Sequence, residues 1–171
     1  MLLGTVLIVV VVVIFVFTMA MSSFYSISGV WEKIEEEAQN AGKERISLGQ
    51  FGPIVVGRRE LPGGHQSFFG VTFAGTVWLK RRDYGSEIFT KQGFPKEIVK
   101  HLEGQVSVRL RLRLSKDNLF LDGVFIPYKI EFTRTPPELT AMRALAAIPR
   151  KYRRAELISL KTPISVSAAS K

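Results

Sequence analysis

The side chains that most often carry enzyme chemistry are scarce in this 171-residue chain. It has two histidines, His65 and His101, and no cysteine, so thiol nucleophiles, disulfides and thiolate zinc sites are excluded. Neither histidine belongs to an HxH or HExxH pair. Ser67, close to His65, has no G-x-S-x-G elbow around it, and the chain has no Walker A or GxGxxG loop. We therefore expect no catalytic residue, metal, cofactor or small-molecule substrate.

Arginines are the side chains best suited to binding. Arg109, Arg111 and Arg113 alternate with leucines and valines in residues 105–114, which is typical of a strand with one polar and one apolar face. Successive guanidinium groups would stand about 7 Å apart and could hold phosphates or carboxylates. A second basic cluster near the C-terminus contains Arg150, Lys151, Arg153 and Arg154. Both sets are candidate contacts for an anionic ligand or partner. The alternative is an ordinary solvated surface.

An uncharged segment opens the chain. Residues 2–21 read LLGTVLIVVVVVIFVFTMAM, and about 20 apolar residues in a helix cover the ~30 Å hydrocarbon core of a bilayer. The pattern predicts a transmembrane anchor over residues 1–22. A cleaved signal peptide is the alternative, although the run is long for a signal core and lacks a basic n-region. The nearest basic residues follow the run, which favours a domain on the cytoplasmic side.

An amphipathic pattern follows this segment. Apolar residues recur at helical spacing and a cluster of glutamates lies off their stripe, which predicts a neck helix over residues 23–43. Such a helix would pack on its own domain, on a partner or along the membrane surface. The candidate packing residues are Phe24, Tyr25, Ile27, Trp31 and Ile34.

Residues 44–160 have the pattern of a mainly β domain. Short extended runs broken by glycine and proline predict about six or seven antiparallel strands. Gly70 and Gly75 suggest the bends that a closing sheet needs, so we expect a small barrel or sandwich. Two short helices are expected, one over residues 94–104 and one between Thr135 and Pro149. Residues 161–171 are expected to form a flexible tail.

The hairpin after residues 105–114 carries a prediction of register. A four-residue loop over residues 115–118 would pair Leu114 with Leu119. Apolar side chains then stay on one face only if one extra residue enters the return strand. We therefore predict a β-bulge at Asp122 and Gly123.

The formal net charge of +9 lies mainly in the predicted β domain, because residues 31–45 hold five glutamates and three basic residues. A basic domain beside a bilayer faces anionic headgroups or an acidic partner, and we expect no nucleic acid. The sequence predicts a non-catalytic, single-pass accessory subunit of a larger complex in the bacterial inner membrane, with integral membrane proteins as partners. The alternative is a membrane-tethered β-barrel sensor that binds a phosphate, a nucleotide or an anionic lipid.

Overall fold

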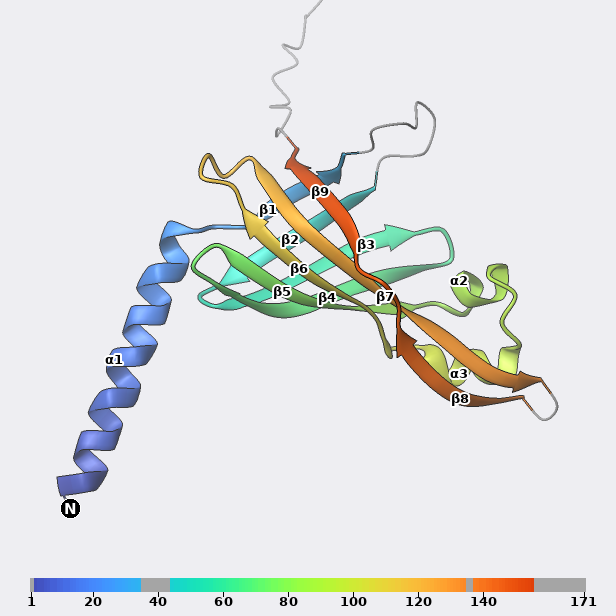
Figure 1. The fold of residues 1–171 in the computed structure, drawn as a ribbon, viewed down its shortest axis with the longest axis horizontal. Coiled ribbons are helices and arrows are strands. Elements are labelled where there is room, and N and C mark those ends of the chain that lie inside the picture. The colour runs from blue at the N-terminus through green and yellow to red at the C-terminus, as the bar shows by residue number, and fades with distance from the viewer. Residues whose placement is uncertain (1, 35–43, 135–136, 156–171) are drawn as a thin grey trace, which may run out of the picture.

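A computed structural model describes residues 2–34, 44–134 and 137–155 (Figure 1). Helix α1 (Leu2–Phe24) is followed by strands and two short helices. The elements after it are β1 (Gly29–Lys33), β2 (Arg45–Phe51), β3 (Ile54–Leu61), β4 (Gly64–Phe73), β5 (Thr76–Tyr84), α2 (Ser86–Lys91), α3 (Lys96–Leu102), β6 (Val106–Leu114), β7 (Phe120–Arg134), β8 (Pro137–Ala144) and β9 (Ile148–Arg154). The predicted tail over residues 161–171 lies outside the described residues.

Eight of the strands form a closed antiparallel barrel. The strand order is β6-β5-β4-β3-β2-β1-β9-β7, and a further pairing of β6 with β7 closes the circle. The ninth strand, β8, pairs with the part of β7 that runs on beyond the barrel. The prediction of a mainly β, antiparallel small barrel is confirmed, and the sandwich alternative is wrong. The chain forms nine strands in the described residues, more than the six or seven expected.

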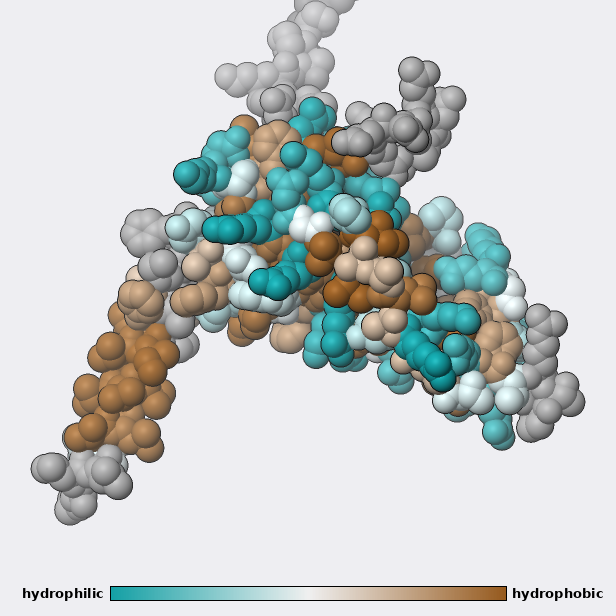
Figure 2. Space-filling model, in the orientation of Figure 1, coloured by the Kyte–Doolittle hydropathy of each residue, from teal (hydrophilic) through white to brown (hydrophobic). Residues whose placement is uncertain are grey.

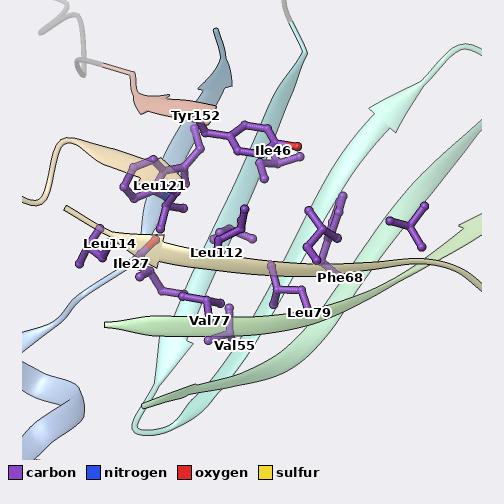
Figure 3. Close-up of a cluster of buried hydrophobic side chains, with 14 residues drawn as sticks. Ile27, Ile46, Val55, Phe68, Val77, Leu79, Leu112, Leu114, Leu121 and Tyr152 are labelled. Atoms are coloured by element: carbon purple, nitrogen blue, oxygen red, sulfur yellow. The ribbon is translucent and has the colours of Figure 1, made fainter. Parts of the chain in front are cut away.

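Apolar side chains from every strand except β8 pack together inside the barrel (Figure 3). Alternating residues of each strand point inward, so residues two apart share the core. Fourteen buried residues form this cluster, including Trp31, Leu79, Leu112 and Tyr152, and Phe125 packs against it. Their burial from water is the main source of the barrel's stability.

A tight turn lies in the segment where Gly70 and Gly75 suggest bends. β4 and β5 form a hairpin in which Phe73 pairs with Thr76, and Ala74 and Gly75 between them both have positive φ. A two-residue turn of this kind matches the twist of the flanking strands. Gly70 is also required, because a Cβ atom there would lie 1.8 Å from the Trp78 carbonyl oxygen.

The predicted β-bulge is wrong. β6 and β7 pair without a break, and Leu114 lies opposite Leu121. The connection between the strands is longer than the four residues expected, because Ser115 accepts the backbone N–H of Phe120 on its side-chain oxygen and closes a wider loop. A shift of two residues leaves each residue of β7 on the same face, since side chains alternate with a period of two. Val124 and Ile126 therefore lie opposite Arg111 and Arg109, on the outer face that the predicted bulge would have kept polar.

Two helix predictions are wrong as well. The neck helix is replaced over Gly29–Lys33 by strand β1, and residues 35–43 lie outside the described residues. The last helix is replaced by β8 over Pro137–Ala144, and its predicted N-cap, Thr135, is not described. Residues four apart share a face in a helix and in a strand alike, so apolar spacing alone could not separate the two. Strand pairing then decides.

A second, smaller core lies beside the projecting β7–β8 arm. α2 and α3 supply its buried residues, which are Phe89, Ile98, Val99 and Leu102, and side chains of the arm pack against them. The predicted helix over residues 94–104 is confirmed as α3, and Gly104 follows it with φ 75°. Figure 1 shows this part of the molecule at the opposite end from α1.

Helix α1 projects away from the barrel as an apolar rod (Figure 2). Described side chains over residues 6–14 are 47 to 65% exposed. Within the described residues, no helix reaches both the length and the apolarity that crossing a membrane requires.

Candidate functional site: the outer wall of the barrel

The predicted arginine row lies on the outside of the barrel. In β6 the valine and leucines at positions 108, 110, 112 and 114 are buried, whereas Arg109, Arg111 and Arg113 between them are exposed. Lys80 lies opposite Arg109 on the neighbouring strand β5. We call these four residues the basic row. They place four cations on adjacent strands of one surface.

Few groups neutralise the basic row. Asp122 lies opposite Arg113 on β7, but its carboxylate is also 3.5 Å from Lys151 Nζ. The guanidinium of Arg109 lies 5.4 Å from the centre of the Tyr128 ring, a cation–π contact that orients the charge without cancelling it. The basic row therefore retains surplus positive charge.

An exposed apolar surface lies directly beside the basic row. Its members point outward from β2, β3, β4 and β5, and their exposed fractions run from 40% for Trp78 to 76% for Phe51. We call this surface the apolar patch. It consists of Phe51, Ile54, Val56, Phe69, Val71, Phe73 and Trp78.

Strand register makes the apolar patch continuous. One row of directly paired residues runs from Phe51 through Ile54 and Val71 to Trp78, which lies opposite Arg111. A second row joins Val56 and Phe69 to Lys80 in the same way. Contiguous exposed apolar surfaces on this scale mark sites of contact with proteins or membranes.

The end of α1 meets the barrel at the edge of the apolar patch. A Cβ atom at Gly52, in the β2–β3 turn, would lie 2.2 Å from the Met19 sulfur. A Cβ atom at Gly75, in the β4–β5 turn, would lie 3.3 Å from the Tyr25 ring. Phe51 and Phe73 directly precede these two turns, so the chain leaves α1 beside the apolar patch.

The second basic cluster does not form one surface. On strand β9, Lys151 and Arg153 share one face, where Lys151 pairs with Asp122 and Arg153 Nη2 lies 3.8 Å from Glu32 Oε2. Arg150 stacks instead over the Phe125 ring at 5.0 Å. Only part of this cluster can therefore face a common ligand.

Arg154 has a structural position. Its guanidinium lies 4.7 Å from the centre of the Trp31 ring. It donates hydrogen bonds to the backbone carbonyls of Ser26, Ser28 and Asn118, at 2.8, 3.1 and 3.0 Å. These bonds tie the segment before β1 to the β6–β7 loop, which occupies the donors that a ligand would need.

The residues predicted to pack on a partner or on the membrane are partly buried in the barrel and partly exposed. Ile27 and Trp31 are fully buried in the barrel core, and the Trp31 indole donates to the Ile27 carbonyl at 2.8 Å. Their burial agrees with packing on the chain's own domain, one of the alternatives that the sequence left open. Tyr25 and Ile34 are each 37% exposed, and the side chain of Phe24 lies outside the described part of the structure.

The barrel interior is polar at the end that lies away from α1. The sequence did not indicate this. The buried carboxylate of Asp83 accepts from Gln66 at 2.9 Å and lies 3.2 Å from the Arg81 guanidinium. Arg59 pairs with Glu44 at 3.3 Å. Among the described residues, every buried side-chain nitrogen or oxygen has a hydrogen-bond partner. This network is internally satisfied and serves the barrel itself.

Tyr152 connects this polar end to the core. Its hydroxyl lies 3.5 Å from Glu44 Oε1. Burial raises the pKa of Tyr152 above its ordinary value, and the nearby charge of Glu44 raises it further. The hydroxyl therefore stays protonated and acts as a donor.

The histidines and acids do not gather into a reaction centre in the described residues. His65 stacks on Tyr84 with ring centres 5.0 Å apart, and His101 lies in α3. No group of three or more metal-ligating side chains occurs in the described part of the chain. What the geometry does assemble is one continuous exposed surface, made of the apolar patch and the basic row.

Sequence reasoning found the three arginines of the basic row and missed Lys80 and the apolar patch. The signal was present in Phe69, Val71 and Phe73, which alternate with smaller or polar residues. Alternation alone does not say which face points outward, because the turn at Ala74 and Gly75 sets that direction. Comparison with known protein families, with curated proteins and with solved structures finds no match to this chain.

Proposed function

We propose that this protein is a single-pass, membrane-anchored accessory subunit that supports a larger membrane complex without catalysing a reaction. The observation that carries the proposal is α1, an uncharged helix whose apolar side chains over residues 6–14 all remain exposed. In water this surface would be costly, whereas lipid or a partner's span would cover it. The barrel then serves as the part that contacts other components.

Sidedness follows from the charges near the helix. No lysine or arginine lies within residues 2–21, whereas the barrel that follows is strongly basic. Basic segments next to a span are retained on the cytoplasmic side. We propose that the barrel faces the cytoplasm, in the bacterial inner membrane.

Alkaline extraction of membranes from cells that express the full chain tests the anchor. We expect the protein to stay in the pellet, and a Leu7→Arg/Val11→Arg variant to be released. A native gel after mild detergent extraction then tests the accessory role. Migration well above the mass of the chain alone supports it. Release of the unaltered protein by alkali would contradict the anchor, and migration as a free chain would contradict the accessory role.

The second candidate is a membrane-tethered sensor for an anionic ligand, and the basic row favours it. Titration of the detergent-solubilised full chain with a nucleoside triphosphate or pyrophosphate tests this function. We expect binding to weaken in Arg111→Ala, which removes the middle cation of β6. Arg143→Ala is the matched control, because Arg143 is exposed on β8 and pairs with Glu131. Equal affinity in both variants would argue against the sensor.

A further inference from the structure

We propose that the barrel lies on its side against an anionic bilayer, with the apolar patch in the membrane interface and the basic row on headgroup phosphates. This inference rests on the proposed anchor, because α1 is what brings the barrel to a bilayer. It adds that the barrel wall, and not only the helix, binds lipid.

The position of the apolar patch carries the first step. All of its residues lie in the half of the outer wall nearest α1, beside the turns that Met19 and Tyr25 contact. The far half of the same strands is polar: Ser47, Arg58, Ser67 and Arg82 form one row of directly paired residues. Apolar character thus rises toward the end where α1 would enter the bilayer.

The composition of the apolar patch suits an interface. Four of its seven members are aromatic, and tryptophan is enriched where proteins meet headgroups. The patch spans four strands and about five residues along β4, which is about 14 Å in each direction. The seven side chains come from consecutive strands, so they form one continuous surface on the outside of the barrel.

The positive charge of the outer wall favours contact with an anionic bilayer over contact with a second copy of the chain. Along β2 to β5, all of which the structure describes, the only carboxylate on the outer wall is Glu60, at the far end. The basic row borders the other side of the apolar patch. In a two-fold contact each copy would offer the same cations and no acids to match them. Anionic headgroups supply the missing negative charge.

The two tryptophans of the chain provide the measurement. Trp31 is fully buried in the barrel core, whereas Trp78 is 40% exposed in the apolar patch. The full chain is reconstituted into vesicles of anionic phospholipid with and without brominated acyl chains, which quench only fluorophores close to them. Subtracting the emission of a Trp78→Phe variant isolates Trp78. We expect bromolipid to remove most of the Trp78 emission and little of the Trp31 emission.

A tryptophan in α1 separates the docking from the anchor. Val10→Trp in the Trp78→Phe background reports whether α1 is inserted. Quenching of Val10→Trp without quenching of Trp78 would overturn the docking and leave the anchor standing. Absence of quenching at both positions would overturn both. A third outcome is that neither aqueous iodide nor bromolipid quenches the Trp78 emission. A second copy of the chain or another protein would then cover the apolar patch, which also overturns the inference.

Charge dependence tests the role of the basic row. We expect Trp78 quenching to fall toward the value in neutral phosphatidylcholine vesicles when Arg109→Gln and Arg111→Gln are combined. The control combines Arg58→Gln and Arg82→Gln, which removes the same charge from the far half of the wall. Equal losses in the two double variants would overturn the assignment of headgroup contacts to the basic row.

Discussion

The two faces of the barrel wall are both rich in large apolar side chains, but only one is covered. Inside, Trp31 is fully buried and its indole N–H is satisfied by the Ile27 carbonyl. Outside, Trp78 and its neighbours stand exposed on the same sheet. Apolar surface inside the barrel is explained by stability, whereas apolar surface outside offers no gain until something covers it. The contrast separates the apolar surface that stabilises the fold from the apolar surface that is left available for contacts.

Truncating the inner tryptophan should have the largest effect. Trp31→Ala removes a fully buried side chain, leaves a cavity and deletes the stacking partner of Arg154. We expect a loss of about 3–5 kcal/mol in the free energy of unfolding. Denaturant titration of the detergent-solubilised full chain, followed by circular dichroism, measures it. Trp78→Ala is the control from the outer face. Similar losses in the two variants would remove the distinction between the faces.

The buried hydroxyl of Tyr152 should make the free energy of unfolding depend on pH. Because the pKa of Tyr152 is raised in the folded barrel, folding keeps the proton while the unfolded chain loses it above about pH 10. The contribution is fully present below that pH and declines as pH rises toward the folded pKa. The decline approaches about 1.4 kcal/mol per pH unit.

Comparison with Tyr152→Phe isolates this effect from the titration of lysines. Stability of the unaltered chain minus that of the variant should fall between about pH 10 and 11.5 and stay constant from about pH 7 to 9. Tyr25→Phe removes a hydroxyl from an exposed residue and controls for that loss. A flat difference across the alkaline range would contradict the coupling of Tyr152 to the core.

The sequence predicted those parts of the fold in which a single local pattern decides. In residues 105–114 the alternation has a period of two over a long run, so the two faces of β6 could be predicted correctly. The helix α3 ends before Gly104, whose positive φ suits glycine. In both cases the neighbours in sequence supply the signal.

The predictions that failed depend on distant partners. Ile27 and Trp31 are four residues apart, which fits a helix face and a strand face equally, and pairing of β1 with β2 and β9 chooses the strand. β8 similarly forms on the free edge of β7. The apolar patch was hidden for a further reason: the turn at Ala74 and Gly75 sets which of the two faces points inward.

Two valines on neighbouring strands give the finest test of the contrast between the faces. Val55 on β3 points inward and is fully buried, whereas Val71 on β4 points outward and is 47% exposed. Val55→Ala should lower the free energy of unfolding by about 2 kcal/mol, since it removes the buried volume of two methyl groups. Val71→Ala should change the free energy of unfolding by no more than about 0.5 kcal/mol, the smallest effect expected here.

Membrane binding should rank the same two variants in the opposite order. With the full chain in anionic vesicles, Val71→Ala should reduce bromolipid quenching of Trp78, because the two residues are directly paired on the patch. Val55→Ala should leave quenching unchanged at temperatures where it remains folded, since its side chain faces the core. If Val71→Ala lowers stability as much as Val55→Ala, the outer valine belongs to the folding core. If Val71→Ala changes the free energy of unfolding little and the quenching of Trp78 not at all, the apolar patch contributes neither to folding nor to lipid binding. Something other than lipid would then cover the patch.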